Sequence, residues 1–170
     1  AGISDPRQGM GLAALWPVLA AALAAQPADV IADCGRLDAG GGPEPVLAAA
    51  RLVVLVLRPT LRQVSKARAR VEMLAQLLGG TGRLALLLVG DGTSSPREIS
   101  KALGVPVTCT LPNDAKAASV LSDGIGSRRG LQARPLIRAA GPAGRALREA
   151  AAGSSPGWPG PTAREASASR

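Results

Sequence analysis

The chain has 170 residues and a formal net charge of +8, with 46% hydrophobic residues and only 1% aromatic ones. This length suits one domain, whose core must be built from Leu, Val, Ile and Ala. The sequence contains no histidine, which excludes histidine-based catalytic triads and histidine metal sites. Cys34 and Cys109 lie far apart, in or just after apolar runs, so we expect buried free thiols in a reducing compartment.

The positive charge is unevenly distributed. From Arg128 to Arg170 there are eight arginines against two glutamates, a local excess of six. Arg62, Lys66 and Arg70 recur every four residues and would form one stripe on a helix. Such a balance favours polyanionic partners, whether nucleic acid, an anionic membrane surface or a nucleotide. A genomic base bias would produce the same arginine-rich and alanine-rich composition.

An apolar segment from Gly9 to Ala25 comes early in the chain. It ends on small residues, as a signal-peptide core does, but Pro17 interrupts it and Asp5 balances the one basic residue ahead of it, Arg7. The segment is also too short and alanine-rich for a membrane span. We therefore expect a helix that packs in the core, with a signal peptide as the alternative.

The next apolar run, Val30 to Ala32, predicts an inner parallel strand. Such a strand would deliver Asp33 and Gly35 to the carboxyl edge of the sheet, where open α/β folds bind ligands. The alternative is a strand that ends in a solvated aspartate at a turn. The glycines Gly40 to Gly42 follow, but no Gly-Lys-Ser/Thr comes after them, so we expect a connector and then a short helix from Val46 to Ala50.

Strands and helices then alternate. Unbroken apolar runs predict further strands over Leu52 to Leu57, covered on both faces, and over Arg83 to Val89. Another strand, broken by Pro106, is predicted over Val105 to Leu111. Pro106 places the last of these near an edge of the sheet. The spacing of apolar residues predicts helices over Gln63 to Leu78, Pro96 to Leu103, a segment ending near Ser122, and Pro135 to Ala151 with a kink at Gly141-Pro142.

This order predicts an α/β fold with a mostly parallel sheet, right-handed crossovers and helices on both faces, in three layers. The strand ends would bring three groups to one edge: Asp33 with Gly35, Gly90-Asp91, and Pro112-Asn113-Asp114. Residues 1–152 would form the domain. Residues 153–170 are rich in Gly, Ser and Pro and are expected to be disordered.

Several stretches together resemble the MinD/ParA-like branch of the P-loop ATPases, which includes proteins that position chromosomes, division sites, flagella and pili. The stretches that carry the resemblance are Asp29 to Leu37, Val53 to Pro59, Leu86 to Gly90, Leu111 to Asp114 with Val120-Leu121 and Gly124, and Pro135 to Ala140. The resemblance implies a P-loop NTPase-like fold and a nucleotide-dependent positioning switch that forms a homodimer around ATP in the cytoplasm, stimulated by a partner protein that the sequence does not identify.

The resemblance also assigns residues. It gives Asp33 the catalytic role of a Walker B-like aspartate that binds Mg²⁺ through water, and Gly35 the switch that senses the γ-phosphate. Asp91 stands where the family usually has the asparagine that reads adenine, and a carboxylate can still accept from an exocyclic amine. The turn from Pro112 to Asp114 would lie beside the base. ATP and Mg²⁺ are the implied cofactors.

One family feature is missing from these residues, the deviant Walker A loop, which is glycine-rich and carries two lysines. Lys66, Lys101 and Lys116 are the only lysines, and none lies in such a loop. Without it, tight ATP binding and hydrolysis should be lost. Because the sequence starts mid-fold, at Ala1 rather than at a methionine, we expect a missing upstream segment rather than a non-hydrolysing relative, and exposed strand edges that make the chain self-associate.

The alternative function is a non-hydrolysing module of this fold that binds DNA or another protein, with Arg62, Lys66 and Arg70 as the nucleic-acid contacts. Relatives of this family bind DNA non-specifically, so the two functions are compatible. No integral membrane segment is expected. Residues 153–170 contain three prolines and no apolar face, which disfavours membrane anchoring through this tail.

Overall fold

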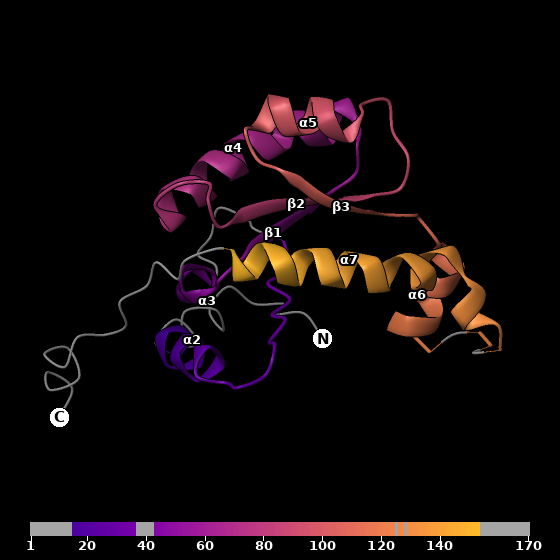
Figure 1. Ribbon diagram of the computed structural model, residues 1–170, viewed down its shortest axis with the longest axis horizontal. Helices are drawn as coiled ribbons and strands as arrows, with labels where there is room; N and C mark the ends of the chain where they lie inside the picture. Colours follow the sequence, from indigo (N-terminus) through magenta and orange to yellow (C-terminus); the bar gives the residue numbers. More distant parts are fainter. Residues whose placement is uncertain (1–14, 37–42, 125, 128, 154–170) are drawn as a thin grey trace, which may run out of the picture. The chain divides into compact units, whose positions relative to one another are not determined.

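Figure 1 shows the computed structural model, which describes residues 15–36, 43–124, 126–127 and 129–153. The chain divides into two compact units, Ala1–Arg51 with Pro156–Arg170, and Leu52–Ser155. The predictions for the start of the chain, for Gly40 to Gly42 and for the tail beyond residue 153 fall outside the described residues.

The described part of the first unit contains two helices, α2 (Trp16–Ala24) and α3 (Glu44–Ala49), which pack against each other. Both helices were expected. The helix predicted over Gly9 to Ala25 is seen as α2 from Trp16, with residues 9–14 outside the described part, and α3 begins two residues before the predicted Val46. Ala20 of α2 is fully buried, but Val18 is 68% exposed, so α2 covers the core with only one side. An alanine-rich helix that is apolar all round leaves apolar side chains in water when only one face finds a partner.

The strand predicted over Val30 to Ala32 is wrong. Residues 29–36 form neither helix nor strand, and the Ile31 side chain is 96% exposed. Asp33 Oδ1 instead accepts a hydrogen bond from the backbone N–H of Gly35 at 2.9 Å, and Gly35 has a φ of 62°. A short apolar run forms a strand only where neighbouring strands pair with its backbone. Where they do not, a local hydrogen bond from the backbone to an aspartate side chain is a common alternative.

The second unit is built on a three-stranded sheet. The strands are β1 (Val53–Leu57), β2 (Leu84–Val89) and β3 (Val107–Leu111), all parallel and in the order β1-β2-β3. The β2–β3 register shifts between Leu86 and Leu87. The predicted mostly parallel α/β fold is therefore confirmed at this level.

β2 is the central strand and forms the core of the unit. Leu84, Ala85, Leu86 and Leu88 are each at most 2% exposed, as expected for a strand covered on both faces. β1 was also expected to be covered on both faces, and this is wrong. It lies at an edge of the sheet with Val56 58% exposed. Apolar character alone cannot separate a central strand from an edge strand, whereas Pro106 correctly placed β3 at an edge.

Helices cover both faces of this sheet (Figure 1). The two crossover helices, α4 (Leu61–Leu78) and α5 (Pro96–Leu103), pack against each other on one face, and α7 (Pro135–Ala152) packs on β3 from the other. Because parallel crossovers share one hand, a sheet whose strand order follows the chain places successive crossover helices on the same face. The larger unit thus has the three predicted layers.

The helices begin and end where local chemistry favours it. α4 buries Ala67, Val71, Leu74 and Leu78 against the sheet and ends at Gly79, which has a φ of 70°. α5 starts with a capping box between Ser95 and Glu98. α6 (Ala115–Ser122) and a short 3₁₀ turn, η1 (Leu131–Ala133), lead to α7, which remains one helix through Pro142.

Candidate functional site

The loops after the three strands meet at the carboxyl edge of the sheet. A Cβ placed on Gly92, after β2, would lie 1.8 Å from the carbonyl oxygen of Pro59, after β1. A Cβ placed on Gly90, which has a φ of 77°, would lie 3.1 Å from Cβ of Asn113, after β3. Glycine is required at both positions for the loops to approach this closely. These contacts bring Gly90-Asp91 and the turn from Pro112 to Asp114 together, as the sequence predicted for these two groups.

The surface formed by these loops includes Asp91 and the turn from Pro112 to Asp114, the two features predicted to lie beside a base. Asp91 and Asn113 are exposed, and Pro112, which precedes Asn113 in the same turn, is half-buried. A carboxylate accepts hydrogen bonds and an amide side chain both donates and accepts, so the pair can match the polar edge of a heterocycle. Such an edge of an open α/β sheet is the usual place for ligand binding.

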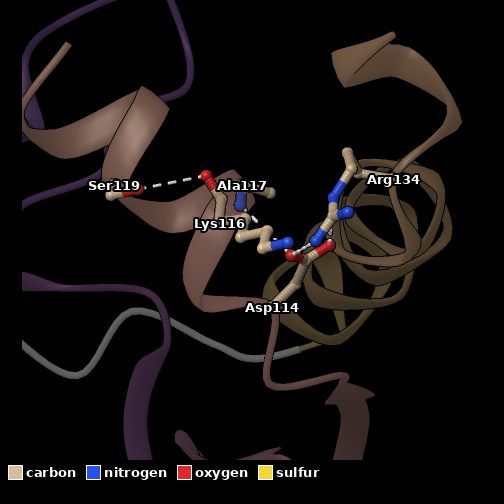
Figure 2. Close-up of polar contacts among 5 residues, drawn as sticks. All are labelled: Asp114, Lys116, Ala117, Ser119 and Arg134. Carbon is tan, nitrogen blue, oxygen red and sulfur yellow. Dashed lines mark hydrogen bonds and ion pairs between the residues drawn. The ribbon is translucent and has the colours of Figure 1, made fainter. Parts of the chain in front are cut away.

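Asp114 has a different environment from Asp91. Its side chain is 4% exposed and forms an ion pair with Arg134, in which Arg134 Nε donates to Oδ2 at 3.0 Å and Arg134 Nη2 donates to Oδ1 (Figure 2). Oδ1 also accepts from the backbone N–H of Ala117 at 3.1 Å and so caps the start of α6. A carboxylate with both oxygens engaged in this way holds the chain around it rather than a ligand.

The pKa values of this pair follow from the geometry. The hydrogen bonds from Arg134 lower the pKa of the Asp114 carboxyl, and the backbone N–H groups of Ala117 and Leu136 lower it further, while desolvation opposes them. The same hydrogen bonds raise the pKa of Arg134. Both groups therefore remain charged at neutral pH. The pair connects the start of α6 to the start of α7, next to the carboxyl end of β3.

Asp33 and Gly35 belong to the other unit. Both are exposed, and the Asp33 carboxylate accepts from the Gly35 N–H, as described above. Burial raises the pKa of the neighbouring Cys34 thiol, and the charge of Asp33 raises it further. Cys109, on β3, also has its pKa raised by burial. Both thiols are free, but they are half-buried rather than buried as expected.

No group of three His, Cys, Asp or Glu side chains among the described residues is placed to hold a metal ion. Mg²⁺ commonly binds proteins through one or two carboxylates together with substrate phosphates, so Mg²⁺ binding by Asp33 through water stays a prediction. The Asp114 carboxylate does not suit a metal, because Arg134 and the α6 backbone use its oxygens.

The basic stripe predicted on the helix after β1 is present on α4. Arg62 and Lys66 are exposed and Arg70 is half-buried, on a line of α4 beside the face that packs on the sheet. Arg70 Nη1 donates to the backbone carbonyl oxygen of Lys66 at 3.5 Å, which holds the Arg70 side chain along the helix. We call these three residues the α4 basic stripe. Its charges face water, where a polyanion can reach them.

In the part of the chain that the structure describes, every helix is too short or too polar to cross a bilayer. Comparison with models of known protein families, with curated proteins and with solved structures finds no match to this chain.

Sequence reasoning missed Arg134, Pro59 and Gly92 as parts of this edge. Arg134 lies 20 residues from Asp114, and its only sequence signal is that it precedes Pro135, the first residue of a helix. In the sequence, Gly92 is simply a glycine shortly after an apolar run, whereas the structure shows that its missing Cβ admits Pro59. Both features depend on contacts between distant segments, which spacing along one segment does not reveal.

Proposed function

We propose that this chain is the nucleotide-binding part of a MinD/ParA-like positioning switch, a protein that dimerises around ATP and thereby marks a place in the cell. The observation that supports it most is the carboxyl edge of the parallel sheet, where Gly90-Asp91 packs beside the turn from Pro112 to Asp114. Open α/β folds usually bind their ligands at this edge of the sheet.

In this proposal, Asp91 accepts a hydrogen bond from the exocyclic amine of the base, and Pro112 offers an apolar surface to the ring. Asp114 does not touch the base. It fixes the turn through Arg134 and the α6 backbone, so that Pro112 and Asn113 keep their place beside Gly90. Asp33 and Gly35 lie in the other compact unit, so their family roles, Mg²⁺ binding through water and the γ-phosphate switch, are proposed from the resemblance alone.

The test is ATP-dependent dimerisation of the protein at its natural length, measured by analytical ultracentrifugation with ATP, with ADP and without nucleotide. Asp33→Ala and Asp91→Ala should each reduce the ATP-dependent dimer fraction. Asp123→Ala, which removes an exposed carboxylate at the end of α6, is the matched control and should not. A protein that is monomeric with ATP, or a dimer that survives both substitutions, would defeat the proposal.

A second function, non-specific DNA binding, is favoured by the exposed α4 basic stripe. Replacing all three of its basic residues by Gln should weaken binding to a short duplex and make it less dependent on salt. The slope of log affinity against log salt should fall by about 0.9 for each lost phosphate contact, or about 2.7 in all. An unchanged slope, or no binding at low salt, would exclude this function.

A further inference from the structure

A cavity of about 320 Å³ lies beside the start of α7, next to the Asp114–Arg134 pair. α6 contributes Lys116 and Ser119 to its walls, the loop after α6 contributes Ser127 and Arg129, and Arg134 lies at its side. Each water in the liquid takes about 30 Å³, so the cavity has room for about ten waters. This is the lower end of the range for small-molecule sites, which begins at about 300 Å³.

The charge of this cavity is strongly positive. Lys116, Arg129 and Arg134 line it, and Asp114 offsets only the charge of Arg134. Within the described residues, neither Lys116 nor Arg129 is paired with a carboxylate. In Figure 2 the Lys116 side chain extends toward the Asp114–Arg134 pair. Lys116 and Arg129 both line the cavity. Two positive charges are therefore available to an anion that enters.

The hydrogen-bond donors are also arranged for an oxyanion. Arg134 has five N–H donors, and Asp114 takes one from Nε and one from Nη2, which fixes the plane of the guanidinium and leaves three donors free of that pair. Ser127 Oγ accepts from the Arg129 N–H at 3.0 Å, so its own proton can be donated elsewhere. A guanidinium that is held in place by one anion loses less conformational freedom on binding a second.

We propose that this cavity binds a small phosphate anion, of the size of inorganic phosphate or pyrophosphate, through Lys116, Arg129 and Arg134. A carboxylate ligand would use the same charges less fully, because it offers two oxygens where a phosphate offers three or more. The site differs from the proposed base site, which uses Asp91 and Pro112, and it does not depend on the nucleotide-switch proposal.

The test is calorimetric titration of the protein with pyrophosphate and with inorganic phosphate at low ionic strength. The double variant Lys116→Gln/Arg129→Gln should bind pyrophosphate about 100-fold more weakly, which is about tenfold for each charged contact. The control Arg138→Gln/Arg145→Gln also removes two positive charges, from exposed positions on α7 outside the cavity, and should change affinity by less than about twofold.

A second measurement avoids variants that fail to fold. Pyrophosphate added to the unmodified protein should shift the backbone amide NMR signals of residues 116–120 and 129–134, and leave those of α4 unchanged. Equal weakening by both double variants would show that only net charge matters and would overturn the proposal. So would the absence of pyrophosphate binding, or DNA binding that depends on Lys116 and Arg129 while pyrophosphate does not bind.

Discussion

The substitution Gly92→Ala would test the close approach of the loops that form the carboxyl edge. The added Cβ would lie 1.8 Å from the Pro59 carbonyl oxygen, so the loops must separate by about 1.2 Å to reach even the 3.0 Å that real Cβ atoms keep. Overpacking typically costs about 1–3 kcal/mol, and the clash here is with backbone rather than a mobile side-chain end. We therefore expect a loss of about 3 kcal/mol in the free energy of unfolding.

Thermal and urea unfolding followed by circular dichroism would measure this loss. Each kcal/mol lowers Tm by about 4–8 °C in a domain of about 60–100 residues, so Gly92→Ala should lower Tm by more than about 10 °C. Gly104→Ala is the matched control, since Gly104 has a φ of 66° and open space around it. Gly104→Ala should lower the free energy of unfolding by only about 1–2 kcal/mol, the cost of placing an L-residue in the left-handed backbone conformation. If Gly92→Ala is tolerated as well as Gly104→Ala, the proposed packing of the edge is wrong.

Three further predictions concern the second unit. Leu86→Ala, at the centre of β2, should lower the free energy of unfolding by about 2–5 kcal/mol in urea titrations. Ser95→Ala should remove the capping box of α5 and cost about 1 kcal/mol in the same assay. Because Arg134 lowers the folded-state pKa of Asp114, this pair stabilises the fold above the unfolded pKa, 3.8, and its contribution is lost as pH falls through the lower folded value. Asp114→Asn should therefore show a lower Tm at neutral pH and a smaller fall of Tm between about pH 4 and pH 2; parallel Tm curves for the two proteins would contradict this.

The regular elements of the second unit could be predicted because their signals are local. Unbroken runs such as Leu84 to Val89 identify buried parallel strands, and the pair Ser95-Pro96 identifies the start of a helix. The positions of Ala67, Val71, Leu74 and Leu78 on one face of α4 follow from helical periodicity. The alternation of these elements then determines a parallel sheet with covering helices.

Features that depend on contacts between distant segments could not be predicted. Val30 to Ala32 has strand-like composition, yet it forms no strand, and Asp33 bonds locally to Gly35 instead. β1 looks as apolar as β2 but lies at an edge, because pairing partners rather than side chains decide strand position. The bond between Asp114 and Arg134 crosses 20 residues, and no spacing rule connects them.

The candidate site was predicted only in part. The sequence placed Asp91 and the turn from Pro112 to Asp114 at one edge, and the structure brings these two together. Their roles differ, because Asp91 is exposed whereas Asp114 is buried in an ion pair. Burial of a carboxylate depends on which segments cover it, so sequence alone placed both aspartates beside the nucleotide.

The most direct test of the proposed nucleotide edge is photo-crosslinking with an 8-azidoadenosine nucleotide, followed by tryptic digestion and mass spectrometry. The proposal predicts labelling of the peptide over residues 84–97, which contains Asp91, or of the peptide over residues 102–116, which contains Pro112 and Asn113. Excess unlabelled ATP should compete with the labelling. Labelling confined to other peptides, or labelling that ATP does not displace, would contradict a base site at the carboxyl edge of this sheet.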